Sequence, residues 1–183
     1  MAAIALACVA SAEAAGVPEP EGYRLDDYRA PVPDSVAGGR VLHTDAVKAM
    51  IDRGGVALID VLPAPRRPEG MRSDMPWLPV PRRDLPGSLW LPDVGRGAIN
   101  SGLDHWFQDE LAQASGGDKD KPFIFYCQAN CWMSWNATKR AASYGYRDVA
   151  WYPEGTDGWA EAGLPLAVAT PEQFTPTLDE TRK

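Results

Sequence analysis

Positive charge, histidine and cysteine are all scarce in this chain. Its 183 residues include 18 basic and 25 acidic side chains, which gives a net charge of −7, together with two histidines and three cysteines. Neutralising phosphates requires clustered lysine and arginine, so the composition argues against a nucleic-acid or anionic lipid partner. His43 and His105 lack ligand spacing, so we expect no metal site. After the first residues, no apolar run is long enough to span a membrane.

The first fifteen residues are small and apolar, and Ala12-Glu13-Ala14 has the form of a leader cleavage site. We therefore predict a signal peptide over residues 1–14. It lacks basic residues, for which the alternatives are a truncated start or a start assigned too far downstream. The alternatives are a disordered alanine-rich tail and, less favoured, a lipoprotein attached through Cys8. Cleavage would place the mature protein in the periplasm, an oxidising compartment in which a disulfide between Cys127 and Cys131 can persist.

The remaining length suffices for one core, and therefore for one domain. Residues 15–39 contain four prolines and little periodicity, which is typical of an extended arm. Strands and helices then alternate, which predicts an α/β fold with a central parallel sheet, helices on both faces, and a site at the carboxyl ends of the strands. The domain should cover residues 40–168 and leave a tail at 169–183. The expected strands are 41–43, 56–61, a short one within 85–92, 123–126 and 149–152, and the expected helices are 44–53, 103–114, 133–144 and 156–163.

A long connection at residues 62–87 contains seven prolines and five arginines. Connections of this length are usually functional or disordered. Its arginines could form an anion-binding shell, although solvated charges are the more common case on a loop. The candidates are Arg66, Arg67, Arg82 and Arg83.

The segment Cys127-Gln128-Ala129-Asn130-Cys131-Trp132 links the most apolar strand to a helix. Backbone N–H groups converge at such a junction, where they bind anions and lower the pKa of a thiol. We therefore expect an accessible Cys127 sulfur surrounded by amide donors. The alternative is an inert buried cysteine.

Cys131 follows Cys127 by four residues. In a helical turn this spacing separates the Cα atoms by about 6 Å, within the range of about 4.4 to 6.8 Å that a disulfide allows. A permanent structural disulfide would close too small a loop to add much stability. We therefore favour a reversible pair over a structural one.

Several runs resemble the ordered landmarks of rhodanese-like domains over about residues 40–166. These runs are VALID at 56–60, LPGS at 85–88, FYC at 125–127, Gly145-Tyr146 before Val149, and Glu154-Gly155 before Gly158-Trp159. More narrowly, FYCQANCWMSWNATKRA and WYPEGTDGWAEAGLPL resemble the CxxxCW-motif proteins associated with pyrroloquinoline quinone (PQQ)-dependent alcohol catabolism. The resemblance implies a periplasmic protein of a quinoprotein alcohol-oxidation system, with Cys127 at the position of the rhodanese nucleophile.

The loop also departs from the family pattern. Its length is similar to that of the Cys-x5-Arg loop of rhodanese-fold phosphatases, but Met133 replaces the arginine. A phosphate would lose its bidentate cation, so phosphatase activity is not expected, and thiosulfate is disfavoured for the same reason. Lys139 and Arg140 should point away from the loop.

Two functions remain open, and a catalytically dead interaction scaffold is a third, less favoured option. In the first, Cys127 attacks a small sulfur electrophile or a redox partner protein and Cys131 resolves the adduct, by sulfur transfer through a Cys127 persulfide or by dithiol redox chemistry. In the second, a non-catalytic module binds a redox cofactor or a partner dehydrogenase, and Trp132 and Trp135 either stack on the ligand or only pack in the core. The expected site residues are Cys127 and Cys131 as catalytic groups, with Gln128, Ala129, Asn130, Trp132, Met133, Ser134 and Asp60 around them.

Overall fold

A five-stranded parallel sheet forms the centre of the computed structural model, which describes residues 16–174. The predicted signal peptide and the last nine residues of the tail lie outside the described residues. The strand order is β1-β6-β5-β2-β4, and every pairing in this sheet is parallel, which confirms the predicted α/β architecture. The strands are β1 (Arg40–Val41), β2 (Ala57–Asp60), β4 (Leu89–Trp90), β5 (Phe123–Tyr126) and β6 (Val149–Tyr152).

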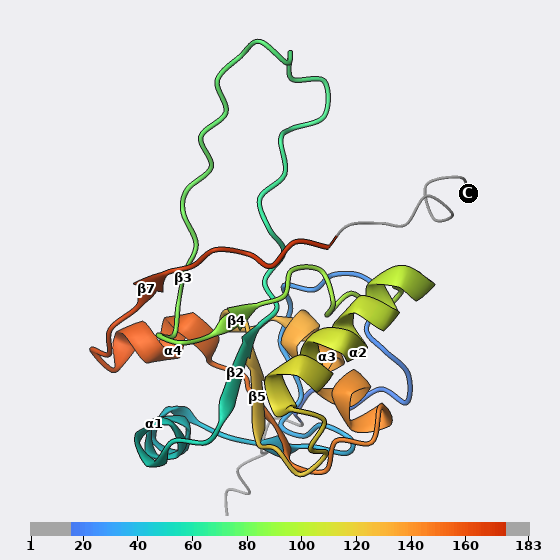
Figure 1. The fold of residues 1–183 in the computed structure, drawn as a ribbon, viewed down its shortest axis with the longest axis vertical. Coiled ribbons are helices and arrows are strands. Elements are labelled where there is room, and N and C mark those ends of the chain that lie inside the picture. The colour runs from blue at the N-terminus through green and yellow to red at the C-terminus, as the bar shows by residue number, and fades with distance from the viewer. Residues whose placement is uncertain (1–15, 175–183) are drawn as a thin grey trace, which may run out of the picture.

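Four helices cover the sheet, two on each face (Figure 1). They are α1 (Thr44–Arg53), α2 (Ser101–Ser115), α3 (Trp132–Ser143) and α4 (Gly155–Glu161). Alternate strand residues point to opposite faces, so Phe123 and Phe125 join the core with α2 and α3, whereas Ile124 and Tyr126 pack with α1 and α4. Burial on both faces explains why β5 is apolar throughout. Within residues 16–174, no helix is both long enough and apolar enough to cross a membrane.

The N-terminal arm, residues 16–39, crosses the outer side of α3 without regular structure. Asn136 in α3 accepts a hydrogen bond from the Arg24 backbone N–H at 2.9 Å and donates to the Arg24 carbonyl at 2.8 Å. The Trp132 and Trp135 indoles donate to arm carbonyls, and the Tyr28 hydroxyl accepts from the Gly97 N–H at 3.0 Å. The arm is therefore part of the packed structure.

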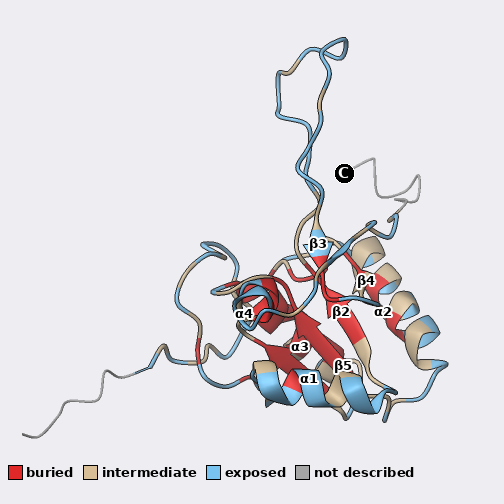
Figure 2. Ribbon diagram, turned by 90° about the vertical axis from the view of Figure 1, so that its left-hand side faces the viewer, coloured by how far each residue is buried: buried red, intermediate tan, exposed pale blue. Residues whose placement is uncertain are grey.

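A second, two-stranded sheet was not predicted. It pairs β3 (Arg83–Asp84) with β7 (Ala167–Val168) in antiparallel fashion, and the Ala169 and Glu172 N–H groups continue the contacts to Arg82 and Trp90. Strands of two residues are too short to produce a readable alternation. Between β2 and β3 the chain leaves the body as a long loop, which is mostly exposed (Figures 1 and 2).

We expect Gly97→Ala to loosen the N-terminal arm. A Cβ at this position would lie 2.1 Å from the Arg24 carbonyl oxygen and 2.8 Å from its carbon, so the arm would have to shift. Overpacking of this kind costs about 1 to 3 kcal/mol. The measurements are urea unfolding and the rate of tryptic cleavage after Arg24. Gly22→Ala is the control, because nothing lies within 4 Å of its added Cβ; equal behaviour of the two variants would contradict the prediction.

Candidate functional site

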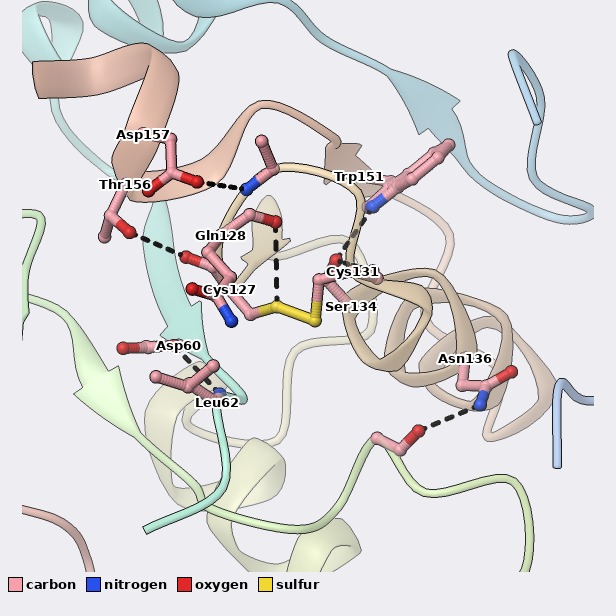
Figure 3. The surroundings of a disulfide bond; sticks show 12 residues. Asp60, Leu62, Cys127, Gln128, Cys131, Ser134, Asn136, Trp151, Thr156 and Asp157 are labelled. Carbon is pink, nitrogen blue, oxygen red and sulfur yellow. Dashed lines mark hydrogen bonds between the residues drawn. A yellow bond between two sulfur atoms is a disulfide. The ribbon is translucent and has the colours of Figure 1, made fainter. Parts of the chain in front are cut away.

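The cysteine loop lies at the carboxyl edge of the sheet, between β5 and α3 (Figure 3). Cys127 and Cys131 form a disulfide with a Cα–Cα distance of 6.5 Å, inside the range that their spacing predicted. Asn130 turns the chain with φ 53°, a left-handed conformation that asparagine tolerates better than most residues. Cys131 is the N-cap of α3. The loop therefore brings both sulfurs to the start of a twelve-residue helix.

The two sulfurs differ in their surroundings. Cys127 is completely buried in the core beneath α2 and α3. Cys131 is 3% exposed and lines a cavity of about 430 Å³. The expectation of an accessible Cys127 is therefore wrong, because Cys127 continues the buried strand β5. The other cavity-lining residues are Asp27, Tyr28, Arg29, Leu62, Pro63, Gln128 and Met133.

Two backbone amides of the loop have partners within the protein. The Ala129 N–H donates to the Asp157 carboxylate at 3.1 Å, and the Trp132 N–H donates to the Tyr28 carbonyl at 3.0 Å. Gln128 forms an antiparallel bridge with Gly155. The expected convergence of these amides on an anion is wrong for Ala129 and Trp132, and the Asp157 carboxylate adds negative charge where a bound anion would lie.

Helix α4 approaches the cysteine loop very closely. Gly155 has φ 52°, and a Cβ there would lie 2.8 Å from both the carbon and the oxygen of the Cys127 carbonyl, so this position requires glycine. The Thr156 N–H and hydroxyl then both donate to that carbonyl, each at 3.1 Å. The start of α4 thus fixes the backbone of the buried cysteine.

Arg82 connects this backbone to β2. Its guanidinium donates to Asp60 Oδ2 at 2.7 Å, to the Cys127 carbonyl at 2.8 Å and to Thr156 Oγ1 at 3.3 Å. Asp60 also accepts from the Leu62 N–H at 3.0 Å. Asp60 is fully buried, and burial raises the pKa of its carboxyl while the Arg82 charge opposes that rise. Arg82 is therefore neither an anion-binding residue nor a solvated loop charge.

A second buried carboxyl lies near this ion pair. Burial, and then the charge of Asp60, raise the pKa of Asp84 to about 6, whereas Arg82 lowers it. The Tyr126 hydroxyl accepts from the Leu85 N–H and donates to Ser88, and burial raises the pKa of this phenol well above its ordinary value. The Arg82 guanidinium thus lowers the pKa of both carboxyl groups, Asp60 and Asp84, at this edge of the sheet.

The remaining predicted arginines are bound within the protein. Arg66 pairs with Asp93 at 2.6 Å, Arg67 donates to two loop carbonyls, and Arg83 donates to the Leu166 carbonyl. Arg140 points away from the cysteine loop, as predicted, and donates to the carbonyls of residues 94, 96 and 97. No shell of arginines surrounds the disulfide within residues 16–174.

The tryptophans and Ser134 contribute packing. Trp132 and Trp135 are at most 2% exposed, so the hypothesis that they stack on a planar ligand is wrong. Ser134 donates to the Cys131 carbonyl at 2.9 Å and accepts from the Trp151 indole at 3.0 Å. Among residues 16–174, no cluster of three or more histidine, cysteine or acidic side chains could hold a metal ion.

The sequence did not identify Thr156, Asp157 and Tyr28 as determinants of the site, and it named Arg82 only as a candidate for an anion-binding shell. Arg82 and Asp60 are 22 residues apart, and Thr156 follows Cys127 by 29. No local pattern links residues at such separations. The sequence showed Gly155 only as a landmark of the family resemblance, and a glycine does not name the backbone that approaches it.

We expect Arg82→Gln to destabilise the protein by about 3 to 5 kcal/mol at pH 8, because it leaves the buried Asp60 carboxylate without its cation. The loss should shrink toward about pH 4. Removing Arg82 raises the pKa of Asp60 further. A carboxyl whose pKa is raised by folding costs stability only above its ordinary pKa, and the cost grows until the pH passes the raised value. Urea unfolding across this range measures the effect.

The neighbouring Arg83→Gln variant is the control, since this exposed side chain bonds only to a carbonyl. Its effect should stay within about 0.5 kcal/mol. A pH-independent loss in Arg82→Gln would show that the charge of Asp60 is not involved.

Several solved structures are similar to this chain. A thiosulfate sulfurtransferase from Pseudomonas aeruginosa is 22% identical over 79% of this chain and 23% of that one, with a TM-score of 0.49. A polysulfide-sulfur transferase homodimer from Wolinella succinogenes is 21% identical over 73% of this chain and 82% of that one, with a TM-score of 0.45. An EanB variant in complex with ergothioneine gives a TM-score of 0.52 at 21% identity, over 78% of this chain and 34% of that one.

At these identities the likeness concerns the fold alone, and this chain spans about a quarter of the first structure. A search of curated proteins found no match. The family model of the rhodanese-like domain matches residues 43–162, which include β2, β5, α3 and the cysteine loop between them. The chain therefore belongs to the rhodanese-like domain family.

Proposed function

We propose that this chain is a thiol–disulfide exchange protein whose working group is the Cys127–Cys131 pair. The observation that carries the proposal is the unequal placement of the two sulfurs. Both cysteines belong to the same buried cluster, but only Cys131, which is 3% exposed, lines the cavity, whereas Cys127 has no exposed surface. An incoming thiolate can reach one sulfur and not the other, which is the arrangement that directed exchange requires.

The roles of the two cysteines are therefore the reverse of those expected from the sequence. A partner thiolate attacks Cys131 Sγ, a new sulfur–sulfur bond forms to Cys131, and the Cys127–Cys131 bond breaks with its electron pair leaving on Cys127. A second partner thiolate then attacks the partner sulfur of the mixed disulfide and releases Cys131. The net reaction oxidises two partner thiols to a disulfide and reduces the pair to a dithiol. The same steps run in reverse when the partner is oxidised.

The start of α3 assists this exchange. Cys131 occupies the N-cap of a twelve-residue helix, where the positive end of the helix dipole stabilises a negatively charged group. The reduced Cys131 is therefore the better nucleophile of the pair. Cys127 has no exposed surface, and its carbonyl is fixed by Arg82 and Thr156, so it re-forms the disulfide from a constant position.

Exchange fits the site better than a persulfide carried on Cys127. A persulfide needs space beyond the sulfur and amide donors around it. Cys127 is enclosed and bonded to Cys131, while the Ala129 amide is bound to Asp157 and the Trp132 amide to Tyr28. The Asp157 carboxylate also disfavours anionic sulfur donors such as thiosulfate.

We further propose that the protein is exported to the periplasm and serves PQQ-dependent alcohol oxidation. Two observations support this setting. The apolar run at residues 1–14 resembles a leader peptide, and the runs around Cys131 and Trp159 resemble CxxxCW-motif proteins. An oxidising compartment would also allow the Cys127–Cys131 disulfide to persist.

The first prediction compares the two single-cysteine variants. In Cys127→Ser, the remaining Cys131 thiol should react with an aromatic disulfide such as Ellman's reagent at least about tenfold faster than Cys127 does in Cys131→Ser. Stopped-flow absorbance measures both rates. All three proteins begin at Ala15, so that Cys8 is absent, and the wild-type chain should show no reactive thiol until dithiothreitol opens the disulfide.

The same variants distinguish exchange from sulfur transfer. Faster reaction of Cys127, together with a mass increase of one sulfur atom on it after incubation with a sulfur donor, would support a persulfide carrier. If the remaining cysteine is unreactive in both variants, the disulfide is structural. Circular dichroism of each serine variant checks that the fold is intact.

A second prediction concerns location and pathway. Intact-mass analysis of the protein from osmotic-shock fluid of its source cells should show a chain that begins at Ala15. Loss of the protein should slow growth on alcohols and leave growth on other carbon sources unchanged. A full-length chain in the cytoplasmic fraction would contradict the export proposal, and equal growth would contradict the pathway.

A further inference from the structure

The loop that leaves the body between β2 and β3 starts at the disulfide cavity. We call residues 63–81 the projecting loop. Leu62 and Pro63, at its first leg, line the cavity with Cys131, and Arg82, at the end of its second leg, bonds to the Cys127 carbonyl. Figure 1 shows both legs rising from the same edge of the sheet. A molecule that contacts the base of this loop therefore lies next to the exchanging sulfur.

The second leg presents apolar side chains to solvent. Leu78 is 92% exposed, Val80 is 86% exposed, and Met75 is half exposed. Figure 2 shows that the outer part of the loop has almost no buried residues. Exposed apolar side chains that gather in one segment mark a contact site, whereas single exposed apolar residues scattered over a surface are normal.

The loop is basic, whereas the rest of the chain is acidic. Residues 63–81 contain three arginines and two acids, which gives +1, so the other residues carry −8 and the total is −7. The Arg67 guanidinium bonds to the carbonyls of Arg72 and Met75 and to no carboxylate among residues 16–174, so its charge is not neutralised there. A partner with negative charge is the one this segment favours.

The projecting loop is also held in place at its tip and at its base. Arg67 Nη1 lies 2.8 Å from the Arg72 carbonyl and 3.1 Å from that of Met75, and these bonds fix the outer turn. At the base, Arg82 is only 11% exposed and is paired with Asp60. A segment that is fixed at its tip and base loses less conformational freedom on binding.

We propose that the projecting loop is the docking element for an acidic redox protein, which lays an apolar, negatively charged segment along the loop and places its thiol or disulfide against Cys131. This inference rests on the proposed exchange function and specifies its partner. A small thiol can enter the cavity without touching Leu78 or Val80, so these exposed groups serve a larger molecule. A second copy fits poorly, because two cavities facing each other would bring two basic loops together.

The experiment measures how fast thiols reduce the disulfide of the full-length protein. One probe is an acidic peptide of about 13 residues, which reaches about 40 Å when extended, with leucines flanking a single central cysteine. A second probe carries lysine in place of every glutamate, and dithiothreitol is the third. The readout is the second-order rate constant of each variant relative to the wild type for the same thiol, so that the intrinsic reactivity of each thiol cancels.

In Leu78→Ser/Val80→Ser we expect the rate with the acidic peptide to fall about tenfold and the rate with dithiothreitol to stay unchanged. In Arg67→Glu the acidic peptide should slow about threefold or more at low salt, with the loss disappearing at high salt, and the lysine peptide should gain. Val168→Ser is the apolar control, since Val168 is 70% exposed on β7. Arg53→Glu, at the end of α1, is the charge control.

Equal losses for all three thiols, or none for any, would overturn the docking proposal. A dimer in solution that Leu78→Ser/Val80→Ser dissociates would also overturn it, in favour of a second copy. Failure of dithiothreitol to open the wild-type disulfide would refute the exchange function instead. In that case fluorescence anisotropy tests docking separately from exchange. It measures binding of the acidic peptide, with serine in place of its cysteine, to the wild type and the same variants.

Discussion

The buried ion pair between Arg82 and Asp60 is the interaction on which the rest of the site depends. Asp60 ends β2 without any exposed surface, and its charge would be costly there without a cation. The same guanidinium donates to the carbonyl of Cys127 and to Thr156. One side chain from the base of the projecting loop thus joins β2, the start of the cysteine loop and α4.

That constraint makes the two cysteines unequal. Cys127 continues β5 into the core, and its carbonyl receives hydrogen bonds from Arg82 and Thr156, so it cannot move outward. Cys131 follows the left-handed turn at Asn130 and lies at the cavity. A rhodanese-like loop usually suggests one exposed nucleophile, but this chain holds its first cysteine inside and presents the second. The chemistry that the fold permits here is set by the packing around the loop.

The sequence predicted those features that depend on local pattern. The apolar run at 123–126 and the helical spacing in residues 103–114 predicted β5 and α2, and the four-residue spacing predicted that Cys127 and Cys131 could bond. The accessible sulfur was misassigned because accessibility depends on segments far away in the sequence. The arm around Tyr28 and the loop start at Leu62 enclose the site, and neither contains a pattern that names its partner. The strands β3 and β7 were missed because two residues are too few to produce a readable alternation.

Stability alone does not explain why an ion pair occupies this position. Replacing a buried ion pair by apolar groups of similar volume is often neutral or stabilising. Apolar side chains could not, however, bond in defined directions to three acceptors on three different elements, as the Arg82 guanidinium does. Its function is therefore geometric. It fixes the base of the projecting loop relative to the Cys127 backbone, so that a partner held by the loop meets Cys131 at a constant position while the outer part of the loop remains free for contact.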